Sequence, residues 1–197
     1  MERRLLKEKK KLDIIRTACR LFAEKGYYNT VIPDIAKALN MSVGNIYNYF
    51  ESKEELAKEI MMIVSNWVAE RLRKINQEDI STKEKIYKYT EEFFKIALEE
   101  PELINYFLRV FLVNREIFKE GCEGFACVGE VVAEVMILLS DGIEKGELRN
   151  QSFFPAFTTI MGPLGGMVFL HNEGVLEKPL MEYTHEVATN IWNALKT

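Results

Sequence analysis

Residues that carry redox and metal chemistry are scarce in this chain. Its 197 residues include only three cysteines and two histidines. Cys19, Cys122 and Cys127 form no Cys-x-x-Cys pair and have no pair of histidines nearby, so neither a disulfide framework nor a zinc site is indicated. Cys19 is most simply a buried core residue. Cys122 and Cys127 could form a redox pair, but plain burial is favoured for both. We therefore expect no metal, no cofactor and a reduced, cytoplasmic compartment.

Catalytic signatures are missing as well. No serine lies in a nucleophile motif, and the sequence holds no His-Glu-x-x-His motif, no glycine-rich dinucleotide fingerprint and no P-loop. Proline is scarce, at five residues, no strand pattern competes with the helical ones, and 48% of the residues are hydrophobic. These features predict an all-α protein that is not an enzyme.

Positive charge is concentrated at one end of the chain. The formal net charge of −4 argues against a non-specific nucleic-acid coat protein, yet residues 1–60 carry 12 Lys or Arg against 9 Asp or Glu. Residues 61–197 carry 14 against 21. A basic run precedes the first helical pattern: Arg3, Arg4, Lys7, Lys9, Lys10 and Lys11. Such a run fits a solvated terminus and a phosphate-contacting arm equally well.

Two short helical segments joined by a tight turn lie between Thr30 and Lys53. The first has apolar residues at helical spacing: Ile32, Ile35, Ala36 and Leu39. Asn40 follows, where the end of a helix needs left-handed backbone angles that Asn tolerates. Ser42 is an expected N-cap of the second segment. The pattern predicts a helix-turn-helix, although an ordinary hairpin of two core helices shares its periodicity.

The second segment leaves a short, uncharged face outward, as a helix must if it presses on base edges in the major groove. This face comprises Val43, Gly44, Asn45 and Asn48. The same stretch resembles the DNA-binding signature of the TetR family of bacterial and archaeal regulators. The resemblance rests on these residues: Ile35-Ala36, Ser42, Gly44, Ile46-Tyr47, Phe50 and Ser52-Lys53-Glu54-Glu55-Leu56.

The resemblance implies a homodimeric regulator that binds a palindromic DNA operator and a small hydrophobic or amphipathic effector. It implies DNA contacts by Thr30, Ser42, Val43, Gly44, Asn45, Tyr47, Asn48, Tyr49 and Lys53. Two departures weaken the match. Val31 stands where the family has a capping Thr, and Pro33 stands where the family often has a long polar side chain that reaches a base. The alternative is a helical protein-interaction module whose DNA-binding head, residues 1–55, is degenerate.

Helical patterns continue to the end of the chain and predict about nine helices. We expect a DNA-binding domain over residues 1–55, a linking helix over 52–75, and a ligand-binding and dimerisation domain over 56–197. Further expected features are helices over 9–25, 103–113 and 118–140, a stop at Gly26, capping boxes at Ser52/Glu55 and Ser81/Glu84, and a Gly-Glu-Leu-Arg turn at 146–149 that also resembles the family.

Residues 153–170 carry no charge. Two prolines, three glycines and the lack of a positive flank argue against a membrane span, so we expect a helix buried on both sides, against its own core and a partner. By resemblance, the dimer interface is assigned to Gly162, Gly165, Gly166, Tyr183, Val187, Ile191 and Trp192.

A ligand pocket is expected in the larger domain. Its candidate lining is Trp67, Phe94, Phe107, Phe111, Met136, Phe157 and Met161, with the polar residues Asn66, Asn105 and Arg109. For each apolar residue, a place in the core is the more common reason for helical spacing. Repression is favoured over activation because blocking a promoter requires occupancy alone.

Overall fold

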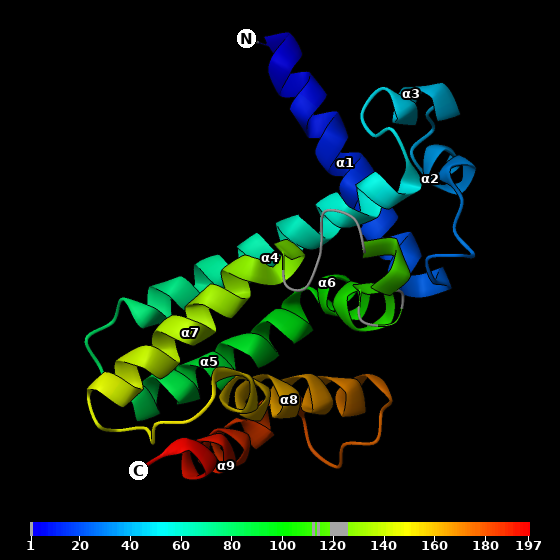
Figure 1. Ribbon diagram of the computed structural model, residues 1–197. Helices are drawn as coiled ribbons and strands as arrows, with labels where there is room; N and C mark the ends of the chain where they lie inside the picture. Colours follow the sequence, from blue (N-terminus) through cyan, green and yellow to red (C-terminus); the bar gives the residue numbers. More distant parts are fainter. Residues whose placement is uncertain (1, 112, 114, 119–125) are drawn as a thin grey trace. The chain divides into compact units, whose positions relative to one another are not determined.

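The computed structural model describes residues 2–111, 113, 115–118 and 126–197. The elements named in this part of the chain are all helical, with nine α-helices and four short 3-10 or π segments, as the sequence predicts (Figure 1). The chain forms two compact units, Met1–Val64 with Pro101–Cys127 and Ser65–Glu100 with Val128–Thr197. These units are not the two predicted domains, because the division within the linking helix falls after Val64 and residues 101–127 group with the N-terminal helices.

The first unit contains α1 (Glu2–Lys25), α2 (Ile32–Ala38), α3 (Val43–Tyr47), the first half of α4 (Lys53–Asn76) and α6 (Pro101–Tyr106). Helix α1 packs against both α2 and α6. The core centres on the fully buried rings of Phe22 and Tyr106, whose centroids lie 6.2 Å apart. The Tyr106 hydroxyl donates to the Ala57 carbonyl at 2.6 Å, and the buried phenol keeps a hydrogen-bond partner in this way.

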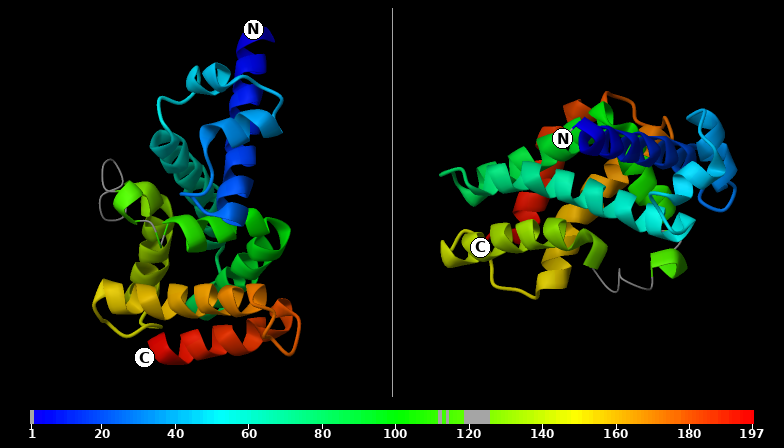
Figure 2. Two further views of the ribbon diagram at one scale, coloured as in Figure 1. Left: turned by 90° about the vertical axis from the view of Figure 1, so that its right-hand side faces the viewer. Right: turned by 90° about the horizontal axis from the view of Figure 1, so that it is seen from above.

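The second unit contains the rest of α4 with α5 (Thr82–Glu99), α7 (Gly129–Glu144), α8 (Phe153–Asn172) and α9 (Thr184–Leu195). A 3-10 turn, η4 (Leu180–Tyr183), precedes α9. Helix α5 contacts α7, α8 and α9, and α8 and α9 run side by side in opposite directions (Figures 1 and 2). The predicted capping box of α5 is present, with Ser81 and Glu84 each binding the backbone N–H of the other.

Three predicted helix boundaries are wrong. Helix α1 begins at Glu2 rather than Lys9, although it ends before Gly26, at φ +83°, as predicted. The predicted helix over 103–113 begins at Pro101 and ends at Tyr106, where a π turn, η1 (Phe107–Phe111), follows. The apolar spacing could not reveal the extra residue of a π turn, because this segment is apolar on every side.

The third wrong boundary is that of the helix predicted over 118–140. Phe118 ends a separate 3-10 turn, η2 (Arg115–Phe118), and a second one, η3 (Ala126–Val128), precedes α7. Helix α7 then continues past Ser140 to Glu144. Among the cysteines, Cys19 is buried and its thiol donates to the Glu102 carbonyl at 3.8 Å, Cys127 is buried and disulfide-bonded, and Cys122 lies outside the described residues. The expectation of a plain buried thiol is therefore wrong for Cys127.

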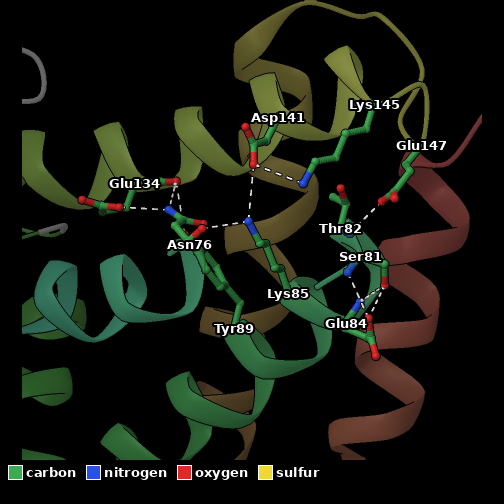
Figure 3. Close-up of polar contacts among 10 residues, drawn as sticks. All are labelled: Asn76, Ser81, Thr82, Glu84, Lys85, Tyr89, Glu134, Asp141, Lys145 and Glu147. Carbon is green, nitrogen blue, oxygen red and sulfur yellow. Dashed lines mark hydrogen bonds and ion pairs between the residues drawn. The ribbon is translucent and has the colours of Figure 1, made fainter. Parts of the chain in front are cut away.

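A polar cluster joins α4, α5 and α7 in the second unit (Figure 3). The buried Glu134 carboxylate accepts hydrogen bonds from Arg73 Nε at 2.7 Å and Asn76 Nδ2 at 2.9 Å. The equally buried Lys85 ammonium donates to the Asn76 carbonyl at 2.8 Å and to Asp141 at 3.3 Å. Because each buried charge has an opposite charge and further hydrogen bonds, the cluster stabilises the packing rather than exposing reactive groups.

The Gly-Glu-Leu-Arg turn fastens the end of α7 to α5 and α9. Glu147 accepts the N–H of Thr82 at 2.6 Å (Figure 3). Arg149 N–H donates to the Leu195 carbonyl at 3.0 Å. Leu148 folds back onto Gly142, where an added Cβ would lie 2.6 Å from the leucine side chain. Gly146 adopts φ +71° between them. The turn thus depends on two glycines, one for its backbone angle and one for close packing.

Candidate nucleic-acid interface

The turn between α2 and α3 has the backbone that the sequence predicts. Asn40 adopts φ 52°, the only positive φ at a non-glycine residue in the described part of the chain. Met41 N–H donates to the Ala36 carbonyl at 2.9 Å and Asn40 N–H to the Lys37 carbonyl at 3.2 Å. These two bonds form a Schellman motif, which satisfies the last carbonyls of α2 and turns the chain into α3.

Both helices of the motif begin at a cap. The Ser42 hydroxyl accepts the N–H of Asn45 at 3.3 Å, which confirms Ser42 as the N-cap of α3. In α2, where Val31 has no capping side chain, the Asp34 carboxylate accepts the Val31 N–H at 3.2 Å. Pro33 lies in the first turn, where its missing N–H costs little. The departures from the family pattern therefore leave α2 intact.

Helix α3 is anchored by one side and exposed on the other. Ile46 is fully buried and Tyr49 is half-buried, whereas six residues predicted to meet DNA are exposed: Ser42, Val43, Gly44, Asn45, Tyr47 and Asn48. The exposed face carries no charge, and the side-chain amide of Asn48 donates to that of Asn45 at 3.4 Å. Nothing lies within 4 Å of the position that a Cβ on Gly44 would occupy. A flat surface of this kind can approach base edges closely.

Thr30 requires a correction, because its side chain is fully buried. The hydroxyl donates to the Leu21 carbonyl at 3.2 Å and the Gly26 carbonyl at 3.0 Å, at the end of α1. Its position in the sequence suggested a phosphate contact, but the hydroxyl faces the interior and has its partners there. Thr30 closes the last turn of α1 and does not reach DNA.

Lys53, at the start of α4, is tied to the loop between α1 and α2. Its ammonium donates to the carbonyls of Tyr27 and Thr30, both at 3.0 Å, and lies 4.1 Å from the centroid of the Tyr27 ring. Partial burial lowers the pKa of Lys53, and the neighbouring Glu54 opposes that change. The predicted phosphate contact stays a prediction, with one N–H left for it. The sequence did not reveal that Lys53 also locks α4 to this loop.

Tyr27 also lies at the corner where the start of α4 meets the loop between α1 and α2. Sequence reasoning missed this residue too. It is buried, and its hydroxyl donates to the Glu54 carboxylate at 3.0 Å. Burial and this hydrogen bond raise the pKa of Tyr27, so the phenol stays protonated and a donor. No sequence motif marks it, because its role depends on two helices that meet in space.

A groove of about 600 Å³ lies beside this corner, within the first unit. It is lined by Tyr27, Tyr28, Ser52, Glu54, Glu55, Lys58, Glu116 and Ile117. None of the residues predicted for the ligand pocket is among them. Among the described residues, no group of three or more His, Cys, Asp or Glu is placed to hold a metal ion.

The residues predicted for the ligand pocket are divided between the two units. Met136 and Asn66 are exposed, so neither fits an enclosed lining, and Phe94 is fully buried in the core of the second unit. The ring of Trp67 is covered by Arg71, whose guanidinium carbon lies 4.3 Å from the ring centroid. Phe107, Asn105, Phe157 and Met161 are half-buried within their units. The side chains of Arg109 and Phe111 lie outside the described part.

The predicted dimer residues also divide. Val187 and Ile191 are buried in the core of their own unit, so they cannot form an interface with another copy, and this part of the prediction is wrong. Helical spacing alone could not tell the inner face of α9 from an outer one. Tyr183 and Trp192 are half-buried. Gly162, Gly165 and Gly166 have nothing within 4 Å of an added Cβ and leave α8 open to a close neighbour.

Comparison with known proteins agrees with the geometry of the head. Residues 14–60 match the model of the family described as bacterial regulatory proteins, tetR family. A curated relative, the uncharacterized HTH-type transcriptional regulator YuxN of Bacillus subtilis, is 35% identical over 100 residues, which span 51% of this chain and 34% of YuxN. The N-terminal part of the chain thus matches the TetR family of transcriptional regulators.

Two further proteins extend the comparison beyond the head. The fatty acid metabolism regulator protein of Bacillus subtilis is 24% identical over 148 residues, which cover 73% of each chain. The crystal structure of the transcriptional regulator FadR from Bacillus subtilis, in complex with stearoyl-CoA, superposes with a TM-score of 0.80 at 22% identity, covering 91% of this chain and 96% of that one. The whole chain therefore has the fold of a TetR-family protein.

Proposed function

We propose that this protein is a dimeric, ligand-responsive repressor that binds a palindromic operator through α3. The observation that carries the proposal is the exposed, uncharged face of α3, held by the Asn40 turn and the Ser42 cap within a stretch that matches the TetR-family model. A helix in this setting enters the major groove with its N-terminal residues toward the bases.

In the proposed complex, Val43 and Gly44 contact thymine methyl groups or sugar edges, and Asn45 hydrogen-bonds a base. Tyr47, Asn48, Tyr49 and Lys53 bind backbone phosphates, which provide affinity without sequence preference. Because α3 carries no Arg or Lys, we expect little direct readout of guanine and a larger share from DNA shape. Pro33 removes the base contact that a long polar side chain on α2 would make.

The exposed apolar face of α8 supports a dimer. Phe154 is 60% exposed, Phe169 54% and Leu170 39%, on a helix whose glycines leave room for a neighbour. By length and composition α8 is also apolar enough to cross a membrane, and 22% of its apolar 18-residue stretch is buried within the protein. One such helix is a weak indication of a membrane. A second copy, packed through α8 with Tyr183 and Trp192, would cover this face and place two heads on two half-sites.

An amphipathic effector is proposed to release the DNA. FadR of Bacillus subtilis is seen bound to stearoyl-CoA, and its fold is shared over most of this chain. A ligand that binds the DNA-free conformation more tightly lowers operator affinity by the ratio of its two affinities. We propose a long-chain acyl derivative as the first effector to test, and a cytoplasmic site of action.

Selection from genomic DNA tests the function. Sheared DNA from the source organism is passed over the immobilised protein at near-physiological salt, and the retained fragments are sequenced. We expect a few fragments that share an inverted repeat. Because Tyr47 is 51% exposed, a Tyr47→Ala variant should fold normally, and it should no longer retain these DNA fragments. If both proteins retain DNA without a shared sequence, or neither retains any, the interaction-module alternative replaces the repressor.

The effector is tested on a recovered fragment. Stearoyl-CoA, octanoyl-CoA and free coenzyme A are titrated into the protein–DNA complex while fluorescence anisotropy of the labelled DNA is recorded. We expect release by the long-chain thioester at concentrations where free coenzyme A has no effect. Equal release by all three, or by none, would remove acyl chains from the proposal and leave the DNA-binding function standing.

A further inference from the structure

The first turns of α1 extend beyond the core of the first unit. The helix is 24 residues long, roughly 36 Å at 1.5 Å per residue, and from residue 5, where the description of its side chains begins, the first buried residue is Ile14. Residues 5–13 are exposed except for the half-buried Lys11. The sequence also allowed a solvated terminus, but α1 is a regular helix from Glu2 onward. The lysines of this segment therefore hold fixed positions around the helix.

One face of this extension lies beside the end of α3. Lys7 Nζ is 6.0 Å from the centroid of the Tyr49 ring, and Lys11 Nζ, one turn later, is 5.3 Å from that of Phe50. Lys11 is neutralised by Glu59, with 2.6 Å between Nζ and Oε1. Lys7 makes no ion pair within the described part of the chain, and its ammonium stays exposed next to a residue expected to contact DNA.

We infer that the Lys7 face of α1 is a second DNA contact, which binds a backbone phosphate beside the half-site that α3 reads. The inference rests on the proposed DNA-binding function. A phosphate held by Tyr49 would lie within reach of the Lys7 ammonium, and a cation of this kind binds phosphate without regard to base sequence. Lys10, about 60° around the helix from Lys7 at 100° per residue, flanks the same face.

The same helix supplies a matched control. Lys9 is also exposed and carries the same charge, but it lies about 160° around α1 from Lys7, on the side of Leu5 and Leu12. A Lys7→Gln and a Lys9→Gln substitution therefore remove the same charge from the same segment. Non-specific attraction between the whole head and DNA would change equally in the two variants, whereas a phosphate contact at Lys7 would be lost in only one.

The salt dependence of operator affinity separates the two cases. The slope of log K against log [salt] is negative, and each phosphate contact makes it steeper by about 0.9. Losing Lys7 from both protomers should therefore make the slope shallower by about 2. We expect this change, with a fall in affinity of roughly 10- to 100-fold near 0.1 M salt, for Lys7→Gln and an unchanged slope for Lys9→Gln. Lys7→Arg should retain the native slope.

The operator itself provides the second arm of the experiment. On DNA trimmed to the inverted repeat, the flanking phosphate is absent, and Lys7→Gln should bind as the native protein does. Equal slopes for Lys7→Gln and Lys9→Gln on the long operator, or a Lys7 effect that persists on the trimmed one, would overturn the inference. Either result leaves sequence-specific binding by the native protein intact, so this failure is distinct from failure of the proposed function.

Discussion

Replacing Gly142 by Ala should destabilise the second unit, although alanine usually favours a helix. The added Cβ would lie 2.6 Å from Leu148 Cγ and Cδ1 and 2.8 Å from Thr82 Cγ2. Leu148 and Thr82 are 2% and 1% exposed, so neither has room to withdraw toward solvent. Overpacking of this kind costs about 1–3 kcal/mol, against a gain of at most about 1 kcal/mol from helix propensity.

The middle of the overpacking range, about 2 kcal/mol, less the full propensity gain leaves a net loss of about 1 kcal/mol, which corresponds to a fall in Tm of roughly 2–4 °C for a chain of this length. The assay is thermal unfolding followed by circular dichroism at fixed protein concentration, since a dimer's Tm depends on concentration. Gly129→Ala is the control, because nothing lies within 4 Å of its added Cβ. Gly142→Ala in a Leu148→Ala background should cost much less than in the native protein.

An unchanged or raised Tm for Gly142→Ala would refute the close-packing argument. A loss of the same size in the presence and absence of Leu148 would also contradict it, because the cost would then arise in the helix itself and not at the contact with the Gly-Glu-Leu-Arg turn.

Three further predictions concern separate parts of the chain. Phe169→Asp places a charge on the exposed face of α8 and should convert a dimer to a monomer in analytical ultracentrifugation; a dimer that survives would move the interface elsewhere. Thr30→Val leaves the Leu21 and Gly26 carbonyls without their buried donor and should cost about 1–3 kcal/mol in urea unfolding, with the salt slope of DNA binding unchanged. Hydrogen bonds from the side chain and backbone of Ser81 lower the pKa of Glu84 below its usual 4.5, so this carboxylate adds stability above that pH and loses it as the pH falls through the lowered value. The stability difference between the native protein and Glu84→Gln should therefore shrink on acidification, and a constant difference from pH 7 to pH 3 would count against the capping box.

Local chemistry made several turns and helix ends of this protein predictable. The left-handed angle at Asn40, the Ser42 cap and the capping box of Ser81 and Glu84 each depend on residues within four positions of one another. The stop of α1 at Gly26 is of the same kind. Because the cause of each feature lies inside the segment that shows it, one sequence was enough.

Features that depend on packing could not be predicted in this way. Thr30 looks like a DNA contact in the sequence, yet it is buried. Lys53 stays a predicted phosphate contact, but the sequence did not show that it also donates to two carbonyls of the loop between α1 and α2. Val187 and Ile191 share the apolar spacing of an interface helix but face their own core. The spacing of apolar residues shows that a face is covered, and only the fold shows what covers it.

The most direct test of the central claim is hydroxyl-radical footprinting of the protein on a genomic fragment that it retains. We predict two protected patches related by the inverted repeat, their centres separated by a whole number of helical turns, about 34–36 Å each, with both patches lost in Tyr47→Ala. Protection of a single patch would contradict a two-fold protein that reads two half-sites, and uniform weak protection would contradict sequence reading by α3.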